Sequence, residues 1–219
     1  MTRVLKFLNY IIFAAIILGL PFSVAHSAEN GLFGTHETRS TDLSAFKKWN
    51  DALARIKKDL EATSSAPGKG CRKTIYQKCP MDDWRSFLAF LKDKPVDRQI
   101  AEINSYMNKS PYITDIINWH VQDYWESIRQ FFSRDGDCED YAIAKYLSLK
   151  ELGFDIDKMR IVVVQDTSLN VPHALLVVTY KGKRLILDNQ IPYVAREKAV
   201  LHYRPFYSIN EHAWWLYRM

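Results

Sequence analysis

Apolar residues recur every three or four positions through the first half of the chain, a spacing that predicts amphipathic helices. The first helix is expected over 41–61, with Ser40 or Thr41 as its N-cap. Its apolar positions are Leu43, Phe46, Trp49, Leu53, Ile56 and Leu60. A stretch rich in Ser, Pro and Gly over 64–70 ends it. Further helices expected from the same spacing cover 81–92, 95–108 and, as one or two segments, 113–132.

The pattern changes after residue 136. The next helix is apolar over much of its circumference and is ended by Gly153, so it is expected to be buried. Runs of β-branched and apolar residues then predict strands, and Lys181-Gly182 predicts a tight turn between the last two. The predicted strands are 159–165, 173–180 and 184–188. Helices first and strands later indicate an α+β fold.

The first 27 residues have the pattern of a secretory signal. Arg3 and Lys6 precede an apolar run over 9–20, and small residues follow, with cleavage expected after Ser27 or Ala28. An uncleaved membrane anchor is the alternative, but the run is shorter than the about 20 residues that cross a bilayer. Cleavage would release an exported protein.

The charge of the chain is mildly positive. The formal net charge is +5, and loss of Arg3 and Lys6 with the leader would lower it to +3. No stripe of Lys and Arg is interleaved with aromatic residues, so the charge does not indicate nucleic-acid binding.

The chain has an odd number of cysteines. Cys71 and Cys79 lie eight positions apart, in a protein expected in a compartment where disulfides persist. A bridge between them would leave Cys138 unpaired. Two unlinked thiols, or a bridge from either one to Cys138, are the alternatives.

Cys138 lies at the start of the buried helix, within the run Gly-Asp-Cys-Glu-Asp-Tyr at 136–141. A helix N-terminus favours an anion, and the thiolate is the reactive form of cysteine. His173 and Asp188 follow at the edges of two predicted strands. Nucleophile, base and orienting acid in this order indicate a cysteine hydrolase or acyl transferase. Singly, each residue could instead be structural.

The predicted hairpin tests this set geometrically. A two-residue loop pairs Tyr180 with Lys183, which places His173 and Asp188 on the same face as diagonal neighbours, roughly 7–8 Å apart at the backbone. A slip of one residue would place them on opposite faces. The tighter loop therefore allows a hydrogen bond between the carboxylate and the imidazole.

Four motifs together carry a family resemblance. They are Trp119-His-Val-Gln-Asp-Tyr-Trp125, Gly-Asp-Cys-Glu-Asp-Tyr-Ala-Ile-Ala-Lys-Tyr (136–146), Leu152-Gly153 and Leu187-Asp-Asn189. They resemble the bacterial transglutaminase-like cysteine proteinases, in particular the LapG-type periplasmic proteases. The resemblance implies a papain/transglutaminase-like core, in which a Cys-bearing helix packs on an antiparallel sheet. By it, Cys138 is the nucleophile, His173 the general base and Asp188 the orienting acid.

The resemblance also bears on domain organisation. A single transglutaminase-like cysteine protease domain is expected over 28–219. Its part over 28–110 is expected to be mainly helical, and 111–219 to form the catalytic core.

Four acids flank the thiol. Asp135, Asp137, Glu139 and Asp140 would raise the pKa of Cys138 by like-charge repulsion. Clustered carboxylates suit Ca²⁺, which would offset this charge, although the spacing is not that of an EF-hand. A solvated acidic turn that caps the helix is the alternative. The resemblance implies calcium dependence, with Asp137 and Glu139 as ligands, and Asp140 is a third candidate.

Catalysis would also need donors for the oxyanion. The backbone N–H of Cys138 is one, and Gln122 or the indole of Trp119 or Trp125 is the candidate for a second.

The resemblance further implies a role for an endopeptidase in the periplasm. Its substrate would be a large surface adhesin, cut near its N-terminus at an Ala-Ala pair, so that release promotes biofilm dispersal. Its partner would be the periplasmic domain of an inner-membrane cyclic-di-GMP receptor. Two alternatives stay open, a transglutaminase-type acyl transferase and a non-enzymatic calcium-responsive binding protein.

Overall fold

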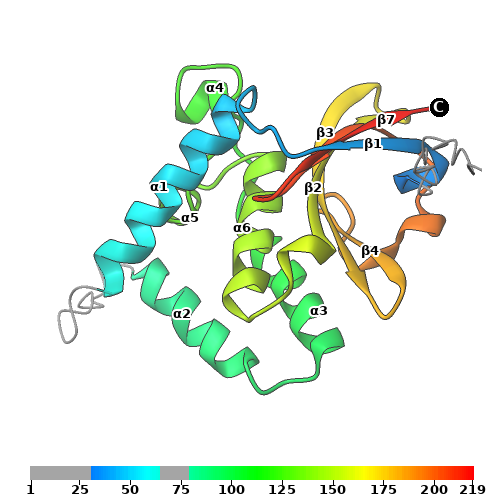
Figure 1. The fold of residues 1–219 in the computed structure, drawn as a ribbon. Helices are drawn as coiled ribbons and strands as arrows, with labels where there is room; N and C mark the ends of the chain where they lie inside the picture. The colour runs from blue at the N-terminus through cyan, green and yellow to red at the C-terminus, as the bar shows by residue number, and fades with distance from the viewer. Residues whose placement is uncertain (1–30, 65–78) are drawn as a thin grey trace, which may run out of the picture.

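A seven-stranded antiparallel sheet forms one layer of the structure, and the main helices form the other (Figure 1). The computed structural model describes residues 31–64 and 79–219, so the expected leader lies outside the described residues. In spatial order the strands are β1 (His36–Ser40), β7 (Trp214–Arg218), β6 (Tyr203–Ile209), β2 (Met159–Asp166), β3 (Val171–Tyr180), β4 (Lys183–Leu187) and β5 (Ala195–Arg196). The predicted α+β class is confirmed.

The helices lie mostly before the sheet in the sequence. They are α1 (Lys47–Ser64), α2 (Pro80–Leu91), α3 (Val96–Met107), α4 (Asp115–Asn118), α5 (Ile128–Arg134) and α6 (Cys138–Glu151). Three 3-10 helices are η1 (Leu32–Gly34), η2 (Ile156–Lys158) and η3 (Glu197–Ala199). The segment expected to form one or two helices forms the short α4 and α5, which are joined by an irregular loop. Among the described residues, no helix combines the length and apolarity needed to cross a membrane.

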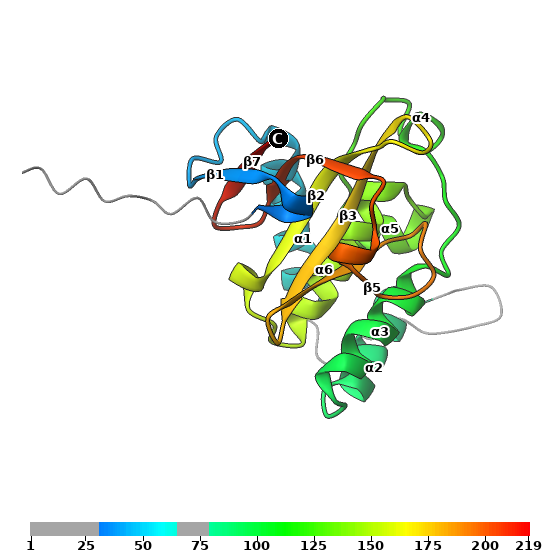
Figure 2. The ribbon, with the colours of Figure 1, turned by 90° about the vertical axis from the view of Figure 1, so that its right-hand side faces the viewer.

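Helix α6 lies at the centre of the molecule, between the sheet and the other helices (Figures 1 and 2). It packs on β2 and β3 on one side and on α3 and α5 on the other. Its residues from Glu139 to Leu149 are buried without a break. A helix that is apolar over most of its circumference is stable only when other elements cover it on all sides. The expected burial of α6 is therefore confirmed.

The central strands are buried on both faces. Ile161 of β2 and Leu176 of β3 join the main core beneath α6. Their neighbours Val162 and Leu175 face a second core, to which η1 contributes Leu32. Because successive side chains point to opposite faces of a sheet, strands covered on both sides read as continuous apolar runs.

The first helix begins at Lys47, later than its apolar spacing predicts. Ser40, one of the two expected caps, instead ends β1 and pairs with Trp214 of β7. Phe46 packs against Tyr207 and Trp214, with ring centroids 5.4 and 5.3 Å apart. Packing against the sheet thus outweighs the helical spacing of the first few residues.

Four strands were not predicted. β1 has the polar sequence His-Glu-Thr-Arg-Ser, and three of its five residues are exposed, because it lies at the sheet edge. It adds a strand to the part of the chain expected to be mainly helical. β6 contains Pro205, and the pairing of β2 with β6 shifts register beside it. Proline is tolerated in a strand at such irregularities, but it obscures the strand in the sequence.

The cysteines fall into two classes. Cys79 is disulfide-bonded, and Cys138 is a free thiol. Cys71 lies outside the described residues, so its pairing with Cys79 stays a prediction. A free thiol at Cys138 is what a nucleophilic role requires.

The close approach of Gly136 to α6 gives a test of packing. A Cβ at Gly136 would come within 2.5 Å of Asp140 Oδ2. Gly136→Ala must displace this carboxylate from the backbone N–H groups it binds, so we expect a loss of about 3 kcal/mol in the free energy of unfolding, measured by urea denaturation. As a control, Gly182→Ala has open space but a φ of +69°, and it should cost about 1 kcal/mol. Equal losses in the two variants would contradict the packing argument.

Candidate active site

Cys138 is the first residue of α6, and Asp137 is its N-cap. Unpaired backbone N–H groups and the helix dipole favour negative charge at this end. The backbone N–H of Ala174, which follows His173 on β3, donates to the Cys138 sulfur. The thiol is therefore held between the helix terminus and the strand that carries the expected base.

His173 and Asp188 form a buried pair. His173 Nε2 lies 2.9 Å from Asp188 Oδ1, and the two side chains are 2% and 0% exposed. The hairpin pairs Tyr180 with Lys183, which is the register of the two-residue loop. The expectation that His173 and Asp188 are diagonal neighbours on one face is confirmed.

A network of donors surrounds the Asp188 carboxylate. Oδ1 also accepts from the Gln190 backbone N–H at 2.9 Å, and the Tyr203 hydroxyl donates to Oδ2 at 2.6 Å. Burial acts to raise the pKa of Asp188, but the bond and charge of His173, together with Tyr203 and Gln190, outweigh it and hold that pKa below its ordinary value. The carboxylate is therefore ionised when it orients the imidazole.

The second nitrogen of the imidazole is bonded to a side chain near Asp188 in the sequence. Gln190 Nε2 lies 3.3 Å from His173 Nδ1. With Nε2 bonded to Asp188, Nδ1 is the nitrogen available as a proton acceptor. The structure thus brings together a free thiol, an imidazole whose Nδ1 is bonded only to the Gln190 side chain among the described residues, and an ionised carboxylate at one end of the sheet.

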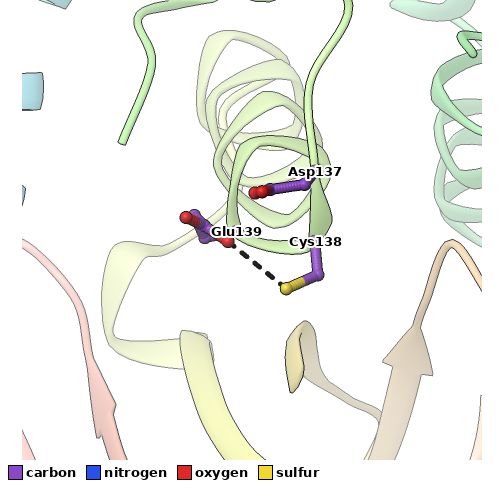
Figure 3. Close-up of side chains that lie close together, drawn as sticks. All are labelled: Asp137, Cys138 and Glu139. Atoms are coloured by element: carbon purple, nitrogen blue, oxygen red, sulfur yellow. Dashed lines mark hydrogen bonds between the residues drawn. The ribbon is translucent and has the colours of Figure 1, made fainter. Parts of the chain in front are cut away.

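The Cys138 thiol forms a hydrogen bond with the next residue of the chain. Cys138 Sγ donates to Glu139 Oε2 at 3.3 Å, and ligand atoms of Asp137, Cys138 and Glu139 all lie within 4.8 Å of one another (Figure 3). Burial, then the charges of Glu139 and Asp137, raise the pKa of Cys138 well above its ordinary value. These surroundings keep the proton on sulfur, as the flanking acids alone suggested.

Carboxylates gather beside the thiol in a larger group than the flanking acids. We call this group the acidic cluster. Its members are Asp115, Asp123, Glu126, Asp137, Glu139 and Asp140. Burial raises the pKa of Asp115 to about 6 and, with nearby acids adding to the effect, that of Glu126 to about 8. Burial is the largest cause of both shifts, so ionised carboxylates at these positions are costly unless a cation offsets them.

The acidic cluster fits a hard cation. Ligand oxygens of Asp115, Asp137 and Asp140 lie within 4.8 Å of one another, as do those of Asp115, Asp123 and Glu139. Asp115 Oδ1, Asp137 Oδ1 and Glu126 Oε2 are buried without a hydrogen-bond partner among the described residues. Buried oxygens without donors are costly unless they coordinate an ion.

Asp140 differs from the other expected ligands. Its Oδ1 accepts from the Glu126 backbone N–H at 2.8 Å, and its Oδ2 accepts from that of Asp137 at 3.1 Å. Both oxygens therefore fasten the loop before α5 to the start of α6. In Asp137 only Oδ2 is bonded to a backbone N–H, that of Asp115 at 3.2 Å, and the buried Oδ1 has no partner among the described residues.

The expected oxyanion donors lie in different surroundings. Gln122 is exposed in the loop between α4 and α5. The Trp119 indole already donates to Glu126, while Trp125 is buried and packs edge-on against Trp49. No contact among the described residues joins Gln122 to Cys138, so its role stays a prediction.

Several residues of the site were missed from the sequence. Tyr203 and Gln190 follow the Asp by fifteen and two positions and carry no spacing signal. Lys145 did carry one, because it is a lysine in an otherwise apolar helix. It is fully buried, and burial lowers its pKa to about 7 although the charge of Asp188 acts in the opposite direction.

Comparison with known proteins agrees with this geometry. The profile of the family described as bacterial transglutaminase-like cysteine proteinase matches residues 69–216. The chain belongs to this family. The structure of Legionella pneumophila LapG is 32% identical, with a TM-score of 0.59 over 74% of this chain and 87% of that chain. Its calcium-bound form matches equally, and its EGTA-treated form is 31% identical with a TM-score of 0.60 over 75% and 86%. No curated protein matches at a significant level.

The acidic cluster predicts how stability depends on pH when no metal is bound. Folding raises the pKa of Asp115 and Glu126 from 3.8 and 4.5 to about 6 and about 8. Between the unfolded and the folded pKa of each group, the folded proteinase binds more protons than the unfolded chain. The free energy of unfolding therefore declines as pH rises through this range. We expect Tm in a chelator to fall between about pH 5 and pH 8, measured by scanning fluorimetry. Glu126→Gln should flatten the fall, and a constant Tm in the parent protein would contradict the prediction.

Proposed function

We propose that this proteinase is a calcium-dependent cysteine endopeptidase that uses Cys138, His173 and Asp188. The observation that supports it most is the buried His173–Asp188 pair beside a free thiol at a helix N-terminus. The three side chains come from α6, β3 and the end of β4. Family membership supports the reaction class independently.

The proposed chemistry follows from the two nitrogens of His173. Nε2–H donates to Asp188, which leaves Nδ1 to take the proton of the Cys138 thiol. The sulfur attacks the carbonyl carbon of a peptide bond, and the resulting imidazolium gives its proton to the leaving amine. Water then attacks the acyl-enzyme, with His173 as base, and releases the carboxylate product and the free thiol. The Cys138 backbone N–H is placed to bind the oxyanion.

The acidic cluster explains the proposed need for calcium. Asp137, Glu139 and Asp115 are the residues that would hold the ion, and Asp123 lies close enough to contribute. Bound calcium would supply positive charge that offsets the carboxylates around the thiol. Glu139 currently accepts the Cys138 thiol proton, so a Glu139 carboxylate engaged elsewhere would release that thiol to His173. The calcium-bound and EGTA-treated forms of the Legionella relative support this choice of metal.

Two substitutions separate metal binding from fold. Asp115→Asn should weaken calcium binding about tenfold or more, because it removes charge at an oxygen without a donor. Asp140→Asn should mainly lower Tm, because it disturbs two bonds to backbone N–H groups. Isothermal calorimetry and scanning fluorimetry in a chelator measure the two effects. Unchanged calcium affinity in Asp115→Asn would remove this residue from the ligand set.

The proposed substrate is the N-terminal region of a large surface adhesin, cut at an Ala-Ala pair. Release of the adhesin would promote biofilm dispersal, and the periplasmic domain of an inner-membrane cyclic-di-GMP receptor would sequester the proteinase. The leader pattern in the sequence supports a periplasmic location. The substrate class is what the resemblance of the four motifs to LapG-type proteases implies.

Cleavage of such a fragment tests the proposal. The parent protein with calcium should cut it at one site, mapped by mass spectrometry, and excess chelator should abolish the cut. Cys138→Ala should lower the rate at least about 1000-fold, because the nucleophile is removed, while calcium still raises its Tm. Full turnover in chelator would remove the calcium proposal, and turnover by Cys138→Ala would remove the nucleophile.

The same assay separates hydrolysis from acyl transfer. A transglutaminase would attach an added primary amine to a glutamine side chain and leave the backbone intact. A proteinase should yield two fragments with and without the amine. A binding protein without activity would yield neither product.

A further inference from the structure

Tyr203, the first residue of β6, touches the outer oxygen of the His–Asp pair. Its hydroxyl donates to Asp188 Oδ2 at 2.6 Å, and the side chain is buried. The two residues lie fifteen positions apart, on a strand that is not a neighbour of β4 in the sheet. This contact therefore exists only because the sheet brings β6 to the same face.

The two oxygens of Asp188 are not equally supported. Oδ1 accepts from His173 and from the Gln190 backbone N–H. Oδ2 accepts from Tyr203, its one hydrogen-bond donor among the described residues. Since the carboxylate is fully buried, no solvent can replace a lost donor. Tyr203 thus fixes the rotation of the carboxylate about its last bond, and with it the direction in which Oδ1 faces the imidazole.

The ring of Tyr203 contacts the imidazole as well. The His173 and Tyr203 ring centroids are 5.6 Å apart, with 34° between their planes. On its other side Phe33 of η1 packs edge-on against Tyr203 at 6.2 Å. The segment that carries Phe33 is held by Arg184, which donates to the Gly31 carbonyl at 2.8 Å. Tyr203 is therefore supported from the N-terminal segment while it supports both members of the pair.

We propose that Tyr203 is a positioning residue for catalysis, which holds Asp188 and covers His173 so that Nδ1 faces the thiol. This inference rests on the proposed cysteine-proteinase function. Tyr203 acts through Asp188 and His173 rather than on the substrate. The hydroxyl stays a donor over the working pH range, because burial and the Asp188 charge raise the pKa of Tyr203.

The charged and titratable groups around the pair come from several elements. They are Lys145 and Cys138 on α6, Asp166 on β2, Asp188 after β4, and His202 and Tyr203 at the start of β6. Removal of the Tyr203 hydroxyl leaves all the other groups in place. A change in pH dependence in such a variant therefore reports on the Asp188–His173 pair.

Tyr203→Phe tests the proposal, and Tyr217→Phe is a matched control. Tyr217 lies in the same second core, and its hydroxyl is 2.6 Å from that of Ser208. Both variants lose one buried hydroxyl with a short bond, but only Tyr203 touches Asp188. Tm of both variants, measured by scanning fluorimetry, gives the purely structural loss.

Tyr203→Phe should lower kcat on the adhesin fragment about tenfold, the rate equivalent of one hydrogen bond to a charged group. KM should change less than twofold. The acidic limb of the rate profile should move to higher pH, because a carboxylate without its second donor holds the imidazolium more strongly. Tyr217→Phe should keep the parent kcat and pH profile.

Alkylation of Cys138 by iodoacetamide, followed against pH, gives a readout that needs no substrate. The same shift of the acidic limb is expected in Tyr203→Phe alone. If the acidic limb of alkylation shifts in Tyr203→Phe but the parent protein cleaves nothing, this inference stands and the proposed function is wrong. Equal kcat and equal alkylation profiles in the two variants would overturn the inference, whatever the substrate.

Discussion

A thiol reacts only after losing its proton, and the start of α6 is arranged in a way that opposes this loss. The helix N-terminus favours the thiolate, but burial and the carboxylates of Asp137 and Glu139 act in the other direction and prevail. The hydrogen bond from Cys138 to Glu139 agrees with this result, because the sulfur donates and therefore still carries its proton. The other parts of the site either offset this negative charge or offer an acceptor for the thiol proton.

Two groups of residues respond to this charge. The acidic cluster offers a cation several buried oxygens that lack donors. His173 offers Nδ1 as a base, while Asp188 holds Nε2. A cation that engages Glu139 would weaken its hold on the thiol, and the imidazole is then the next acceptor. In the proposed mechanism, one glutamate would thus couple metal binding to proton transfer.

A buried helix and a tight hairpin hold these groups in place. Helix α6 is buried along eleven consecutive residues, and the β3–β4 hairpin turns through only Lys181 and Gly182, both with positive φ. A loop longer by one residue would move Asp188 to the other face of the sheet. The second core adds a less evident support, because η1 and β6 hold Tyr203 against Asp188 from outside the hairpin.

Local pattern in the sequence determined much of this protein. The helical spacing identified α2, α3 and α6, the two-residue turn set the register that pairs His173 with Asp188, and the acids next to Cys138 revealed the charge problem. Each of these depends on residues near one another in the chain. The tertiary structure alone decided what depends on distant residues. These features are the packing of Phe46 against the sheet, the polar edge strand β1, the orphaned oxygen of Asp115, and the bond from Tyr203 to Asp188. Contacts between residues far apart in the chain have no fixed spacing in the sequence, so no periodic pattern predicts them.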